Sequence, residues 1–220
     1  MGKTPTVTSM RVIPVAGRDC MLMTLSGAHA PYFTRNIVLL TDSDGHTGVG
    51  EIHGGTHTYQ ELTDYIPLVE GREIGNYRAV VQSLFDLNRK KCALRACGEG
   101  IQCLDISKLK FVVQAEAAVE TAMLDLLGQY MGLPVCALLA GGQQRELVRM
   151  LGYLFYVSDQ ARAEELGYWD ESESDVEWFR RRRTVTLTPE EIVKEAEVLK
   201  ARYGFHDFKL KGGVFSCGEE

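Results

Sequence analysis

A strand, a helix and a second strand follow one another near the C-terminus, and this order constrains the fold more than any other part of the sequence. Residues 150–157 (MLGYLFYV) form a nearly continuous apolar run, which is typical of a strand buried on both faces of a parallel sheet. Residues 188–204 have helical periodicity, and residues 205–213 (FHDFKLKGG) have the pattern of a second strand. Such a unit requires a parallel sheet and a right-handed crossover. Two strands do not complete that sheet, so we expect this chain to be the front half of a longer protein.

The helix between these strands carries boundary signals at both ends. Thr188 is a suitable N-cap, Pro189 occupies the first helical position and Glu191 completes a capping box. Gly204 is placed to end the helix. The apolar spacing predicts a buried stripe that consists of Ile192, Val193, Ala196, Leu199 and Tyr203.

Two lysines, Lys209 and Lys211, lie two residues apart in the second strand. Residues i and i+2 of a strand project from one face, so both ammonium groups can enter one cavity while Phe208 and Leu210 point into packing on the other. A lysine held beside another positive charge in a partly dry pocket can act as a base. The alternative is an edge strand whose lysines discourage aggregation. Both lysines lie at the C-terminal end of a parallel strand, where α/β folds place their chemistry, and this favours the functional interpretation.

The N-terminal part of the chain has strand patterns followed by helical ones. Residues 6–16 alternate apolar and polar, and residues 35–42 and 46–52 flank an Asp-Gly pair suited to a tight hairpin turn. Three antiparallel strands are therefore predicted. The glycine- and alanine-rich residues 25–36 are expected to form a mobile loop.

Helical spacing follows over residues 58–69 and 77–87, and most strongly over residues 111–131. Residues 88–110 have no lasting period and are expected to be irregular. A glycine ends the long helix, and a proline begins a short one through residue 139. We therefore predict one α+β domain over residues 1–140 and the first βαβ part of a second domain over residues 141–220.

Composition narrows the classes of function. A net charge of -6 without a lysine-rich tail argues against a nucleic-acid partner. No segment approaches the roughly 18 apolar residues that a membrane helix needs. The six cysteines contain no CxxC pair, and no secretory segment opens the chain, so reduced thiols in a cytoplasm are expected.

Five segments together resemble the glucarate dehydratases and their related proteins in the enolase superfamily. They are residues 26–36, 45–51, 122–129, 141–157 and 203–213. The resemblance covers essentially the whole chain. It implies an α+β capping domain followed by the start of a (β/α)8 TIM barrel, truncated after about two barrel strands.

The resemblance also implies a reaction and its residues. A magnesium-dependent enzyme would remove the proton α to a carboxylate of D-glucarate or a similar hexarate, and the β-hydroxyl would then be lost. By motif match Lys211 is the base, and Lys209 is the neighbouring cation that holds the carboxylate. His29 and Tyr153 match residues that contact the substrate.

The chain departs from the family pattern at two positions, and these departures bear on the identity of the substrate. Cys103 stands where the family has a threonine that contacts the substrate, and a thiol is a weaker hydrogen-bonding group than a hydroxyl. Thr24 stands where these dehydratases usually have an asparagine.

The ending of the chain is the larger departure. The resemblance implies that the magnesium ligands and a second base, a histidine, lie beyond the end of this chain, so the 220-residue chain is expected to be inactive alone. A homo-oligomer is expected for the full-length protein, with a small sugar diacid as its ligand.

Two alternatives stay open. The first is a non-catalytic truncated remnant. The second is a Schiff-base lyase or aldolase in which Lys209 or Lys211 attacks a carbonyl. Borohydride trapping of a lysine would favour the lyase, and loss of activity on chelation would favour the magnesium enzyme.

Overall fold

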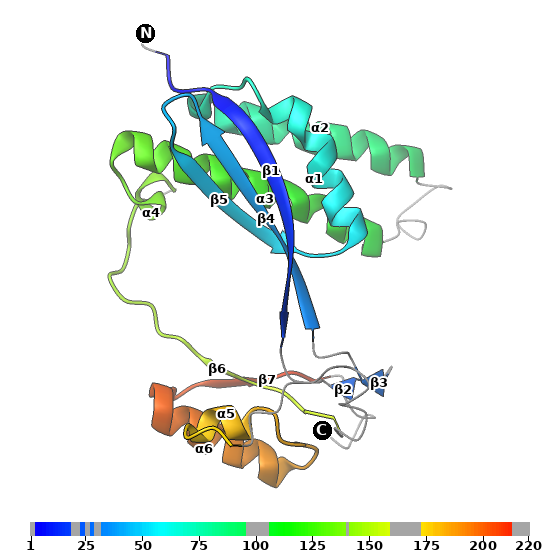
Figure 1. Cartoon of the computed structure of the whole chain (residues 1–220), viewed down its shortest axis with the longest axis vertical. Coiled ribbons are helices and arrows are strands. Elements are labelled where there is room, and N and C mark those ends of the chain that lie inside the picture. The colour runs from blue at the N-terminus through cyan, green and yellow to red at the C-terminus, as the bar shows by residue number, and fades with distance from the viewer. Residues whose placement is uncertain are drawn as a thin grey trace. The chain divides into compact units, whose positions relative to one another are not determined.

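The chain separates into two compact units in the computed structural model (Figure 1). Unit 1 comprises Met1–Ala16 and Thr34–Gln144, and unit 2 comprises Gly17–Phe33 and Arg145–Glu220. The segment 17–33 thus groups with the C-terminal part of the chain. The residues that the structure describes are 3–18, 23–24, 27–28, 32–95, 106–139, 141–158 and 173–212.

A three-stranded sheet has the order β1 (Val7–Arg18), β4 (Tyr32–Asp42) and β5 (Thr47–His53). The predicted hairpin is confirmed, because β4 and β5 pair antiparallel and Gly45 in the turn has φ 87°. That positive φ is the conformation that glycine adopts without steric cost.

The predicted loop over residues 25–36 is wrong for residues 27–28 and 32–36, which form strands, and its other residues lie outside the described ranges. Strand β4 already begins at Tyr32, so the hairpin strand extends further than its apolar residues indicate. Two short strands, β2 (Met23–Thr24) and β3 (Gly27–Ala28), pair with each other antiparallel. The prediction relied on the glycine and alanine content of this segment, whereas strand pairing depends on the backbone.

The helices of unit 1 are α1 (Thr56–Val69), α2 (Tyr77–Arg95), α3 (Ile106–Met131) and α4 (Val135–Leu138), with a 3-10 turn, η1 (Ile74–Asn76). The prediction that residues 88–110 are irregular is wrong at both ends, because α2 continues to Arg95 and α3 begins at Ile106. The residues at the end of α2, RKKCALR, include lysine, arginine, alanine and leucine, which are strong helix formers. Their propensity extends the helix although the apolar period has ended.

Helix α3 lies across the sheet, and α1 and α2 lie on the same side of the sheet (Figure 1). The closest approach is at Gly50, where a Cβ atom would lie 1.9 Å from the carbonyl oxygen of Ala118. A residue with a side chain would therefore push β5 away from α3. Sixteen of the described hydrophobic residues form the core, including Leu40, Leu62 and Leu126.

Unit 2 contains β6 (Gly152–Leu154), α5 (Glu177–Arg181), α6 (Pro189–Tyr203) and β7 (Phe208–Leu210). Strands β6 and β7 pair in parallel, which confirms the predicted βαβ unit. Both strands are shorter than predicted, because a hydrogen-bonded ladder extends only as far as both partners do. Helix α5 lies between β6 and α6 in the chain.

The predicted ends of α6 are confirmed, but its predicted buried face is partly wrong. Thr188 and Glu191 form the capping box, and Gly204 ends the helix with φ 71°. The side chains of Val193 and Tyr203, however, are 56% and 48% exposed. The buried stripe is narrower than predicted because the helix packs on one side only.

None of the helices within the described ranges is long and apolar enough to cross a bilayer.

Candidate functional site

The pairing of β6 with β7 brings the predicted site residues of the barrel part together. Tyr153 lies opposite Lys209 in the parallel register. The amide of Lys211 donates to the carbonyl oxygen of Leu154 at 3.1 Å, so the pairing continues past the end of β7. Because register partners share a face, Tyr153, Lys209 and Lys211 project from one face of this two-stranded sheet.

The opposite face of β6 and β7 is packed. Leu154 and Tyr156 are buried with Ile192 and Leu199 of α6, and Phe208 packs against this cluster. The prediction for Leu210 is wrong, because its side chain is 38% exposed. It is the last residue of β7.

The face that carries the lysines is open in the described chain. Lys209 and Lys211 are exposed, and the side chain of Tyr153 is 42% exposed. Neither lysine forms an ion pair with any described residue. Two cations without a carboxylate partner on one face favour an anionic ligand, since Lys binds carboxylate groups as a point charge.

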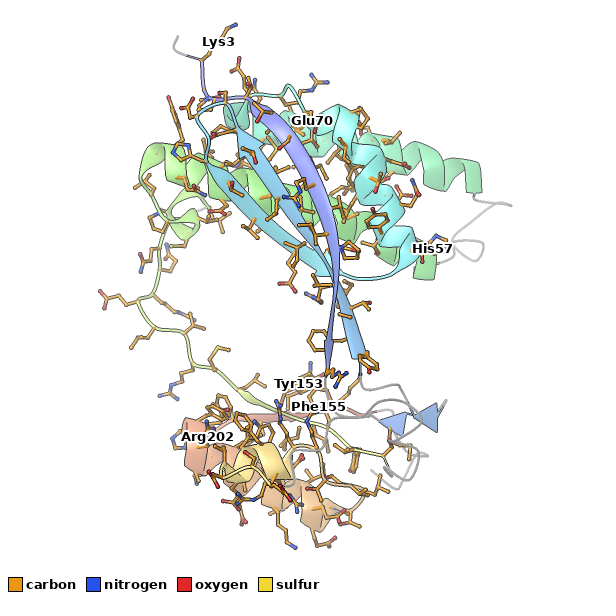
Figure 2. All side chains as sticks on the ribbon, viewed as in Figure 1. Lys3, His57, Glu70, Tyr153, Phe155 and Arg202 are labelled. Carbon is orange, nitrogen blue, oxygen red and sulfur yellow. The ribbon has the colours of Figure 1, made fainter. Side chains whose placement is uncertain are left out.

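One lysine is in contact with an aromatic platform. The Lys209 Nζ atom lies 5.2 Å from the centroid of the Tyr153 ring, within the range of a cation–π interaction. The ring of Phe155 lies 4.2 Å from that of Tyr153, centroid to centroid, at an interplanar angle of 51°. Figure 2 shows Tyr153 and Phe155 close together along the chain at β6. The sequence interpretation missed Phe155, although its i+2 spacing from Tyr153 indicates a shared face.

Two other predicted residues, His29 and Cys103, lie outside the described residues. Thr24 is described through its backbone, in β2. The neighbouring amide of Met23 donates to the carbonyl oxygen of Tyr156 at 3.2 Å, and Met23 packs against the core of unit 2. The segment that carries Thr24 is therefore attached to the chain just after β6.

A buried carboxylate, Glu195, lies on the packed side, on α6. Burial raises the pKa of Glu195 to about 7, against the opposing effects of the nearby Arg181 charge and a hydrogen bond with Thr186. Thr186 in turn exchanges backbone hydrogen bonds with Val157, at 3.0 and 3.1 Å. Glu195 therefore belongs to the packed side of unit 2 and does not face Lys209 and Lys211.

A magnesium site is not formed by the described residues. Among them, no group of three or more His, Cys, Asp or Glu side chains is placed to hold a metal ion. Magnesium prefers oxygen ligands from carboxylates, and the open face instead carries two cations. The described residues therefore fit the binding of a carboxylate and not the binding of the metal.

The sequence is similar to that of a known protein. A protein of Streptomyces coelicolor named "Probable glucarate dehydratase" is 32% identical over 220 residues, which cover 98% of this chain and 47% of the relative. The chain thus spans about half the length of this curated relative. No known protein-family profile matches the sequence.

Solved structures show the same relationship. An enolase from Mycobacterium smegmatis, complexed with tartrate, is 31% identical with a TM-score of 0.74, over 98% of this chain and 46% of that one. An enolase from Thermobispora bispora, complexed with magnesium and formate, is 28% identical with a TM-score of 0.73, over 97% and 47%.

These neighbours confirm the predicted fold class. Unit 1 corresponds to an enolase-type α+β capping domain, and the βαβ part of unit 2 is the start of a (β/α)8 barrel. Over nearly its whole length, the chain is thus similar to about half of a protein named as a probable glucarate dehydratase and to about half of solved enolase structures.

Proposed function

We propose that this chain contributes to an acid-sugar dehydratase that acts on D-glucarate or a related hexarate. The observation that carries the proposal is the shared open face of β6 and β7, where Tyr153 and Lys209 are register partners and Lys211 follows on the same face. The S. coelicolor relative bears the name of that activity, and the M. smegmatis structure contains tartrate, which is also a hydroxylated diacid.

The roles of the two lysines follow from their surroundings. Lys209, held over the Tyr153 ring, provides a fixed positive charge for a carboxylate of the substrate. Lys211 has no ring or ion-pair partner among the described residues and is available to take the α-proton. The electron pair of the broken C–H bond moves towards the carboxylate, and the β-hydroxyl then leaves as water after it takes up a proton.

Magnesium would stabilise the negative charge that develops on the substrate carboxylate. The T. bispora enolase was solved with magnesium, which supports this cofactor for the proposed enzyme. The described residues of this chain provide no ligand group for it, so we assign it no contact here. We further expect Cys103 and Thr24 to shift the choice among hexarates, and we expect a cytoplasmic homo-oligomer.

The exchange of the substrate α-proton with solvent tests the proposal. In a chimera, residues 1–212 of this chain would be followed by the remaining half of the S. coelicolor relative. With magnesium and D-glucarate in D2O, NMR should show loss of the α-proton signal. The Lys211→Ala chimera should lose this exchange entirely, because the group that takes the proton is gone. The Lys209→Ala chimera should bind the substrate more weakly.

The matched control is Lys194→Ala, which removes an exposed lysine of α6 that lies outside the proposed site. This variant should exchange as the parent chimera does. Near-normal exchange in the Lys211→Ala chimera, or equal losses in the Lys194→Ala control, would contradict the proposed roles.

A further inference from the structure

We propose that Phe155 is a positioning residue of the lysine site, acting through the ring of Tyr153 on the ammonium group of Lys209. The inference rests on the proposed function for the role of Lys209 in binding a carboxylate. Its structural part, the dependence of the Lys209 position on Phe155, stands on the contacts of the described residues alone.

The first contact joins the two aromatic rings. Their centroids are 4.2 Å apart and the planes are tilted by 51°. Aromatic pairs usually lie about 4.5–7 Å apart, so this pair is close. Tyr153 is 42% exposed and lies on the face of β6 and β7 opposite the cluster with α6, where none of the described helices of unit 2 supports it. Among the described residues, the half-buried Phe155 is an aromatic neighbour that limits how far the Tyr153 ring can tilt.

The second contact joins the Tyr153 ring to Lys209. The ammonium nitrogen lies 5.2 Å from the ring centroid, and the electron-rich face of the ring attracts it. The register pairing of Tyr153 with Lys209 fixes the two Cα atoms opposite each other, so the orientation of the ring decides whether the contact forms.

The two lysines of the motif are therefore not equivalent. Lys209 has an aromatic support, and Lys211 has no such contact among the residues that the structure describes. A smaller side chain at position 155 would let the Tyr153 ring tilt away, and Lys209 would lose its place while Lys211 would be unaffected. Phe155 thus helps to hold the ammonium group of Lys209 in place and does not act on that of Lys211.

Methyl NMR tests this geometry without requiring activity. Reductive methylation with 13C-formaldehyde converts lysines to dimethyl-lysines that keep their charge, and methyl groups over an aromatic face resonate upfield. In the 220-residue chain, the Lys209 signal should lie upfield of the Lys211 and Lys194 signals. Tyr153→Leu should abolish this upfield shift, and Phe155→Leu should remove most of it.

Two further variants separate positioning from general stability. Phe155→Tyr keeps the ring and should retain the upfield shift. Phe155→Met keeps a large apolar side chain without a ring and should lose it, while the methyl signals of Leu154 and Leu199 stay in place. A Lys209 signal at the Lys194 position in the parent, or an unchanged shift in both Phe155→Leu and Phe155→Met, would overturn the proposal.

The two proposals fail in distinguishable ways. If the Lys209 shift depends on Phe155 but the chimera does not exchange the α-proton, positioning stands and the dehydratase function is wrong. If the chimera exchanges normally and Phe155→Leu leaves both the Lys209 shift and the KM for D-glucarate unchanged, the dehydratase function stands and positioning is wrong.

Discussion

The two compact units bury their apolar side chains to very different extents. Among the described residues, sixteen hydrophobic side chains form the buried core of unit 1, and four form that of unit 2. In unit 1 three helices lie on one face of the sheet (Figure 1), and in unit 2 the described residues that pack on β6 and β7 also lie on one face. The candidate site thus lies in the unit whose described core is the smaller.

Both units also bury a polar group, in different settings. In unit 1 the Asn88 amide donates to the Tyr65 hydroxyl and, at 2.5 Å, to the Glu116 carboxylate. Burial raises the pKa of Glu116, a shift that the Asn88 hydrogen bond opposes. In unit 2 the buried Glu195 lies near a cation on α5. The buried polar group of unit 1 thus connects three helices, and that of unit 2 holds the segment before α6.

The largest expected effect comes from a matched pair of leucines, one in each core. Leu126→Ala should lower the free energy of unfolding of unit 1 by about 4–5 kcal/mol, because Leu126 is fully enclosed between α3 and the sheet. Leu199→Ala should cost about 2–3 kcal/mol in unit 2, since partly buried neighbours can move into the space. Urea unfolding, followed by hydrogen exchange in each unit, measures both. Equal losses of unfolding free energy in the two variants would contradict the difference between the two cores.

The second effect is the pH dependence that Glu195 gives to unit 2. Its folded-state pKa of about 7 lies above its ordinary value of 4.5, so the folded form binds the proton more tightly. The stabilisation is complete below pH 4.5 and is lost as the pH rises through 7. The loss is of the order of 2–3 kcal/mol.

Glu195→Gln should remove this dependence, because glutamine does not titrate. The variant should gain about 2 kcal/mol relative to the parent between pH 5 and pH 8. The control is Glu197→Gln, an exposed carboxyl on the same helix, which should follow the parent at every pH. Parallel stability curves for Glu195→Gln and the parent would show that Glu195 does not titrate in this range.

The smallest of the three effects concerns the buried hydroxyl of unit 1. Tyr65→Phe removes the group that accepts from Asn88 and should cost about 1 kcal/mol, since Asn88 keeps its bond to Glu116. Tyr59→Phe, at a position 39% exposed, should change nothing measurable. Thermal unfolding of both variants checks this. A loss in Tyr59→Phe as large as in Tyr65→Phe would contradict the role of the buried hydrogen bond.

Local signals in the sequence predicted local structure well. The capping box of Thr188 and Glu191 and the turn at Gly45 depend on residues a few positions apart, and both are confirmed. The exposure of Val193 could not be predicted, because it depends on which elements cover α6. The apolar period identifies the apolar face of a helix. It does not say how much of that face a neighbouring element covers.

The candidate site was predictable where it depends on local sequence patterns. The two lysines follow from strand periodicity, and their pairing with β6 follows from the βαβ pattern. The contact between Phe155 and Tyr153 depends on side-chain rotamers and on an open face, which no sequence pattern specifies. His29 and Cys103 rest on resemblance and stay predictions.

A titration of the 13C-methylated chain with D-glucarate tests directly our claim that the open face of β6 and β7 binds a sugar diacid. We predict that the Lys209 and Lys211 signals shift saturably, while the signals of Lys194 and Lys200 on α6 stay in place. Lys209→Ala should weaken the response of Lys211. Equal, unsaturable shifts of all four lysines, or no shift of Lys209 and Lys211, would contradict the claim.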